Sequence, residues 1–131
     1  METAKILQTL PKILEQNKRE EYFEKGFVTL ENIIPRDWVT RLSICSDRLL
    51  DESRNVKESN DSFDLGPNHN SASPHVRRLK ALVDRDPVYW EFASESLLGD
   101  IAADLVGPDV KFHSSKLNYK WPGHGEIVKW H

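Results

Sequence analysis

The chain has 131 residues, which is enough for one domain of ordinary size. Its 21 acidic residues outnumber its 18 Lys and Arg residues, which argues against a nucleic-acid-binding protein that relies on phosphate contacts. No apolar run approaches the roughly 18–20 residues that span a bilayer. The N-terminus has no basic region followed by a long apolar stretch, so we expect no secretory signal, and the single Cys45 cannot form an internal disulfide. We therefore expect a cytoplasmic protein without membrane or nucleic-acid partners.

The first 25 residues predict helix, because apolar residues recur at steps of three and four. Pro11 interrupts this pattern and splits the helix in two. Gly26 marks its end, since glycine readily takes the left-handed conformation after a last helical turn. Residues 27–30 are rich in strand-forming types and predict a short strand.

A second helix is expected to start near Arg36, with an apolar stripe formed by Trp38, Leu42, Cys45 and Leu49. Cys45 lies on this stripe. Because no Cys/His pair accompanies it, we interpret Cys45 as a small buried apolar residue. A reactive thiol is the alternative.

Residues 51–75 are dominated by Ser, Asn, Asp, Gly and Pro and predict a long loop. We favour a partly ordered flap, in which Phe63 and Asp64 would close over a substrate, over a free linker. The following residues, 76–82, are ambiguous between strand and helix. Their small basic cluster, which includes Lys80, is typical of a solvated face.

Helix returns after Asp86 and Pro87, with one helix over 88–94 and another over 96–106. Beyond the helix-stopping Gly107 and Pro108, alternation predicts strands at 110–112, 117–121 and 127–130, with a bulge at 114–115. Helices therefore precede strands in one domain over residues 1–131, an α+β order. About four short strands cannot close a barrel, and the last residue falls inside a predicted strand, so we expect further sequence after it.

The C-terminal segment 113–131 carries a recognisable arrangement. Lys116 and Asn118 lie on one predicted strand, a Pro/Gly turn follows, and His131 ends the next strand. Residues 22–30, a helix ending in glycine before a Phe-Val strand, and residues 97–109, a helix before Gly-Pro, match the same family pattern. In this order and spacing the chain resembles the phytanoyl-CoA dioxygenase family over most of residues 20–131.

This resemblance implies an Fe(II)- and 2-oxoglutarate-dependent dioxygenase that hydroxylates a small organic or acyl substrate. Its fold would be a jelly-roll core, a double-stranded β-helix, with helices packed outside, and this chain would supply its N-terminal part. The family holds iron with two His and one carboxylate, which leaves coordination positions open for 2-oxoglutarate and O₂.

The same resemblance assigns candidate roles to single residues. His131 would be the first iron ligand, in a His-x-Asp pair whose Asp falls beyond the chain. Lys116, Lys80 and Asn118 would contribute to the 2-oxoglutarate pocket. We therefore expect the 131-residue chain to be inactive alone. Relatives act on acyl-CoA thioesters, solutes such as ectoine, or natural products, and some halogenate instead of hydroxylating.

Two other classes of function stay open. The chain is alternatively a non-catalytic binding domain, or one half of a split enzyme, that self-associates through open strand edges. The third hypothesis is a metal site formed by His113, His124 and His131, although their spacing matches no standard zinc pattern. His69 and His75 are expected to be solvated loop residues.

Overall fold

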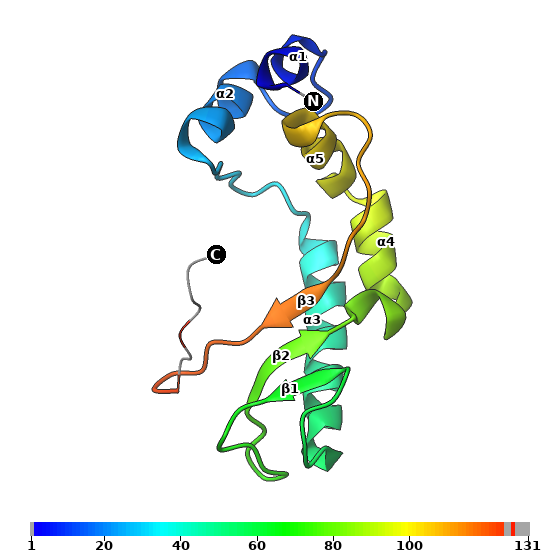
Figure 1. Cartoon of the computed structure of the whole chain (residues 1–131). Coiled ribbons are helices and arrows are strands. Elements are labelled where there is room, and N and C mark those ends of the chain that lie inside the picture. The colour runs from blue at the N-terminus through cyan, green and yellow to red at the C-terminus, as the bar shows by residue number, and fades with distance from the viewer. Residues whose placement is uncertain (1, 125–126, 128–131) are drawn as a thin grey trace. The chain divides into compact units, whose positions relative to one another are not determined.

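The computed structural model describes residues 2–124 and 127. Its helices and strands form two compact units, which are described separately here. The first unit combines Met1–Val39 with Trp90–His113, and the second combines Thr40–Tyr89 with Ser114–His131. Figure 1 shows the elements in chain order, from α1 to β3.

The first unit contains short helices, and the sequence predicts the residues that separate or end them. Helix α1 (Thr3–Gln8) and helix α2 (Gln16–Lys25) are separated around Pro11, and Gly26 takes the left-handed conformation at φ 80°. Helix α5 (Leu98–Val106) completes the unit and ends at Gly107, whose φ is also positive. Such residues act on their own backbone, so these helix ends can be predicted from the sequence.

A buried polar clasp joins these helices. The Asp104 carboxylate of α5 accepts backbone N–H groups of Lys12, Ile13 and Leu14, each at 2.8 Å. The guanidinium of Arg19, which is also buried, donates to the backbone oxygen of Asp104 at 2.9 Å. Around the clasp the apolar side chains of Ile6, Leu14 and Ile101 are buried. The residues after Pro11 thus obtain their hydrogen bonds from a side chain instead of from a helix.

The second unit is built on helix α3 (Arg36–Glu52), whose residues from Thr40 onward belong to it, and on a three-stranded antiparallel sheet. The strands are β1 (Phe63–Leu65), β2 (Val76–Lys80) and β3 (Lys116–Asn118), with β2 in the middle. Figure 1 shows β2 between its two partners. Two 3-10 turns, η1 (Ser53–Asn55) and η2 (Leu82–Asp84), connect the elements.

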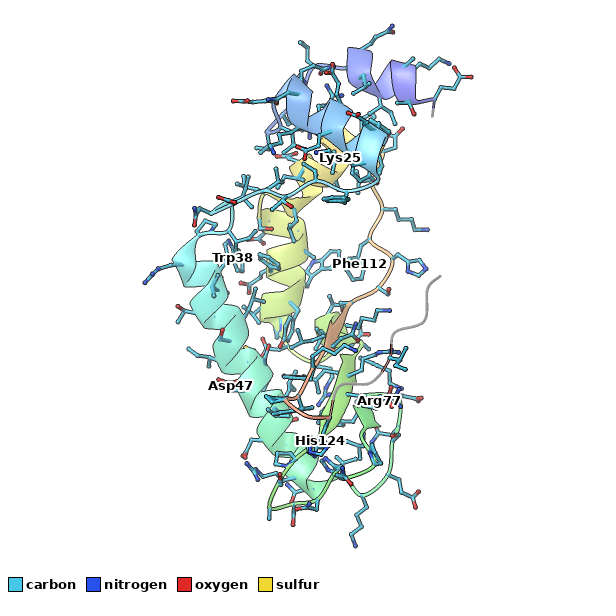
Figure 2. All side chains as sticks on the ribbon, turned by 90° about the vertical axis from the view of Figure 1, so that its left-hand side faces the viewer. Lys25, Trp38, Asp47, Arg77, Phe112 and His124 are labelled. Atoms are coloured by element: carbon cyan, nitrogen blue, oxygen red, sulfur yellow. The ribbon has the colours of Figure 1, made fainter. Side chains whose placement is uncertain are left out.

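The core of this unit lies on one face of the sheet. Phe63, Val76 and Leu79 are buried on the strands, and Leu49 of α3 is buried with an exposed fraction of 1%. Figure 2 shows the part of α3 that holds Asp47 running beside the strands. In this unit, α3 and one face of the sheet thus carry buried apolar residues.

Helix α4 (Pro87–Glu95) starts as predicted after Asp86. The Asp86 carboxylate accepts the backbone N–H of Val88 at 2.9 Å, and Pro87 occupies the first helical position. This hydrogen bond is the largest contribution that lowers the pKa of Asp86, and the carboxylate also pairs with Arg48 at 2.9 Å.

Several predicted strands are wrong. Residues 27–30 and 110–112 form no strand. The strand predicted at 117–121 is shorter and starts one residue earlier, at Lys116–Asn118. Strand-forming residues adopt a strand only where a neighbouring strand pairs with them, and in the described part of the chain these two segments pair with none. The strand predicted at 127–130 falls almost wholly outside the described residues, and Ile127 itself is not in a strand.

The expected bulge at 114–115 is also wrong, since no strand reaches those residues. The register shift occurs between β1 and β2 instead: Asp64 faces Arg78 and Leu65 faces Val76, so Arg77 is the extra residue of β2. The ambiguous segment 76–82 proves to be strand β2 followed by η2.

The observed mixture of helices and a small antiparallel sheet is compatible with the predicted α+β class. The described residues contain three strands and form no jelly-roll core. Across residues 2–124, no helix has both the length and the apolar character needed to cross a membrane.

Candidate functional site

The sheet of the second unit has one polar face. Because side chains alternate along a strand, Arg78 and Lys80 of β2 lie opposite the buried Leu79. On β3, Lys116 and Asn118 lie on the same polar face as these two residues, since Arg78 pairs with Asn118 and Lys80 with Lys116. All three predicted 2-oxoglutarate residues, Lys80, Lys116 and Asn118, are therefore brought together.

The polar face carries an unusual like-charge pair. Lys80 and Lys116 are directly opposite each other in the register of β2 and β3. Like charges at facing positions destabilise a sheet slightly, and an anion bound between them would relieve this repulsion. Lys116 is exposed and Lys80 half-buried, which leaves both ammonium groups within reach of a ligand from solvent.

Neighbouring residues complete this arrangement. The Arg78 Nε donates to the Asn118 Oδ1 at 3.0 Å, which fixes the amide with its NH₂ group as the remaining donor. Asp64, which faces Arg78 across β1 and β2, also lies 3.8 Å from a terminal nitrogen of Arg77. The face therefore has three cations against one carboxylate among Arg78, Lys80, Lys116 and Asp64.

Sequence reasoning missed the role of Arg78 in this face. The basic cluster of residues 76–82 comprises Arg77, Arg78 and Lys80, and of these Arg78 and Lys80 share a face. Residues two apart share a face in a strand, so the sequence could indicate this pair only if the segment were known to be a strand.

The long loop over residues 51–75 is held by its own polar side chains. Asn60 Oδ1 accepts the backbone N–H groups of Ser62 and Phe63 at 2.8 and 2.9 Å, and Arg54 donates to the backbone oxygens of Ser71 and Ala72. The predicted loop also contains η1 and β1, and its role as a flap stays a prediction.

Phe63 does not act as the predicted flap residue. Its ring is 5% exposed and lies under the Arg85 guanidinium, 4.4 Å from the ring centroid. It belongs to the core of the sheet, so of the two flap candidates only Asp64 is on the polar face.

The histidines of this loop are not solvated as predicted. His69 Nδ1 accepts the backbone N–H of His75 at 2.9 Å, and its Nε2 lies 3.0 and 3.1 Å from the carbonyl oxygens of Ser53 and Val56. This pattern places the proton of the neutral ring on Nε2. His69 therefore fastens η1 to the start of β2.

Cys45 is half-buried, whereas the favoured interpretation was a small buried apolar residue. Burial raises the pKa of its thiol, and a hydrogen bond from the thiol to the Asp86 carboxylate raises it further. Since the thiolate is the nucleophile, these surroundings disfavour reactivity.

The predicted iron ligand His131 lies outside the described residues. Within residues 2–124 and Ile127, no three His, Cys, Asp or Glu side chains are close enough to hold a metal ion together. The proposed site from His113, His124 and His131 therefore receives no support from the part of the chain that the structure describes.

Comparison with known proteins gives one informative match. The chain is 29% identical over 106 residues to an ectoine dioxygenase of Sphingopyxis alaskensis. The match covers 81% of this chain and 33% of that enzyme, so the chain spans about a third of the length of the curated relative it matches. It supports the resemblance to dioxygenases at the superfamily level. No family model and no solved structure gives a significant match.

Proposed function

We propose that this chain is part of an Fe(II)- and 2-oxoglutarate-dependent dioxygenase, and that Lys80, Lys116 and Asn118 contribute to its 2-oxoglutarate pocket. The single observation that carries this proposal is the cross-strand pairing of Lys80 with Lys116 on the polar face. The similarity to ectoine dioxygenase supports the oxidoreductase class.

The polar face suits a dianionic ligand. Two ammonium groups at facing positions repel each other, and a carboxylate between them turns this repulsion into two charge-assisted hydrogen bonds. The NH₂ group of Asn118, held by Arg78, offers a neutral donor beside them. 2-Oxoglutarate carries two carboxylates, so a cationic face of this kind complements its charge.

The described residues do not form the iron centre, because they contain no three-ligand group. His131 is the candidate ligand within this sequence, and the other ligands would come from residues beyond the described part. When bound, Fe(II) supplies the oxygen chemistry of such enzymes, whereas the protein binds and orients the reactants.

The substrate is proposed only as a class, a small organic or acyl molecule. The matched relative is named for ectoine, which makes ectoine the first compound to test. Substrate contacts in enzymes often lie on loops, so a distant relative does not fix the substrate.

Titration of the chain with 2-oxoglutarate tests the pocket directly. We expect saturable binding that Lys80→Ala or Lys116→Ala weakens about tenfold to a hundredfold, since a charge-assisted hydrogen bond contributes about 1.5–3 kcal/mol. Lys111→Ala is the matched control, because Lys111 is an exposed lysine just before this strand and is absent from the polar face.

Two results would contradict the pocket. In the first, 2-oxoglutarate does not bind. In the second, Lys111→Ala weakens binding as much as the two strand variants, which would indicate unspecific attraction to positive charge.

A further inference from the structure

We propose that His75 and His124 together bind a divalent transition-metal ion of the zinc and nickel type. Their ring centroids lie 4.9 Å apart, and the Nδ1 atom of His75 is buried without a hydrogen-bond partner. A buried polar atom without a partner calls for an explanation, and a bound ion supplies one. Figure 2 shows His124 in the turn that follows β3.

The spacing of the two rings suits a shared metal ion. With nitrogen–metal bonds of about 2.0–2.1 Å and an angle between right-angled and tetrahedral, two coordinated imidazoles have centroids roughly 5 Å apart. The rings are tilted at 65° to each other, and His124 is exposed, so its ring is free to direct a nitrogen at the ion. Water would reach the other coordination positions from the exposed side.

His75 is held in place from both sides of its own backbone. Its N–H donates to His69 Nδ1 at 2.9 Å, and its carbonyl oxygen accepts the N–H of Gly66 at 2.7 Å. A Cβ atom at Gly66 would lie 3.2 Å from this carbonyl oxygen, so the close approach depends on glycine. The ligand position is therefore fixed before any ion binds.

The turn that carries His124 is tied to the same place. The indole Nε1 of Trp121 donates to the carbonyl oxygen of Val76, the residue after His75, at 2.8 Å. The N–H of His124 donates to the carbonyl oxygen of Trp121 at 3.1 Å, which closes the turn. Trp121 also packs edge-on against the His75 ring, at 5.4 Å between centroids.

The donor set points to the class of ion. Imidazole nitrogens suit zinc, nickel and copper, whereas magnesium and calcium prefer oxygen ligands. In the described part of the chain only two strong ligands meet here, so we expect moderate affinity and a coordination sphere completed by water. This site uses neither His113 nor His131.

The test is a calorimetric titration of the 131-residue chain with Zn²⁺ and, separately, Ni²⁺. We expect one ion per chain, and His75→Ala or His124→Ala should each weaken binding at least about tenfold, since loss of even an outer-shell partner costs that much. His113→Ala is the matched control and should leave the affinity unchanged.

NMR of the unaltered chain is a second test that does not depend on a variant folding. In the unaltered chain, Zn²⁺ should shift the ring-nitrogen NMR signals of His75 and His124 and leave those of His69 and His113 in place. The proposal is overturned if Zn²⁺ and Ni²⁺ do not bind, if the other ring nitrogens shift instead, or if His113→Ala abolishes binding.

Discussion

At the scale of single residues, the buried Asp104 carboxylate accepts three backbone hydrogen bonds in the first unit. Burial alone would raise the pKa of this carboxyl, but three backbone N–H donors and the nearby Arg19 outweigh burial and lower it. The ionised form is therefore the one that the fold uses. Asp100, one turn earlier on α5, makes only an exposed ion pair with Lys12 at 2.6 Å.

This contrast predicts unequal effects of two similar substitutions. Asp104→Asn should lower the free energy of unfolding by about 3 kcal/mol, because it places an NH₂ group among three N–H donors and removes the negative charge near buried Arg19. Asp100→Asn should cost less than about 1 kcal/mol, as exposed ion pairs do. Urea denaturation of both variants measures the difference, and equal losses would show that the clasp is not stabilising.

The lowered pKa of Asp104 also predicts how stability depends on pH. The unfolded chain binds a proton near pH 4, before the folded chain does, so the contribution of Asp104 is present above that pH. It is lost as the pH falls through the lower pKa of the folded state. Chemical denaturation at several pH values should therefore show the stability gap between the unaltered chain and Asp104→Asn shrinking below pH 4. A constant gap would contradict this account.

At the scale of elements, the parts that sequence could predict are those fixed by local chemistry. Pro11, Gly26 and the Asp86-Pro87 pair each act through their own backbone or a neighbouring N–H, and the structure agrees at all three places. The strands at 27–30 and 110–112 were predicted wrongly, because a strand depends on a partner that its own residues do not specify.

The candidate site divides in the same way. Lys80, Lys116 and Asn118 were proposed from the family resemblance, but their position on one face with Arg78 depends on strand register. The contact between His75 and His124 depends on two loops far apart in sequence, so no local pattern could have predicted it.

The helix ends allow a paired test of backbone conformation. Gly26→Ala should destabilise the chain by about 1 kcal/mol, because its φ of +80° strains any residue with a Cβ. Gly99→Ala, within helix α5 where a Cβ meets nothing within 4 Å, should stabilise by about 0.5–1 kcal/mol. Thermal unfolding of the two variants distinguishes them, and a shift of the same sign in both would be inconsistent with these conformations.

At the scale of the whole molecule, β3 is an outer strand in the described sheet. The N–H of Tyr119 donates to the carbonyl oxygen of Arg77, so by alternation the N–H of Asn118 points away from β2, to the side of β3 where no other described strand pairs. An exposed edge favours pairing with another strand.

We predict that the isolated 131-residue chain self-associates through this edge. Asn118→Pro removes the outward N–H and should shift sedimentation equilibrium toward monomer. An unaltered chain that stays monomeric at every concentration would contradict the prediction, as would a Pro variant that associates equally well.

We propose that this chain is part of an iron- and 2-oxoglutarate-dependent dioxygenase. The most direct measurement is succinate formation from 2-oxoglutarate by the complete product of its coding sequence, with O₂ and with or without added Fe(II). We predict succinate formation that requires Fe(II), is lost in His131→Ala and needs more 2-oxoglutarate in Lys116→Ala. No succinate in the presence of iron, or turnover that survives removal of iron, would contradict the claim.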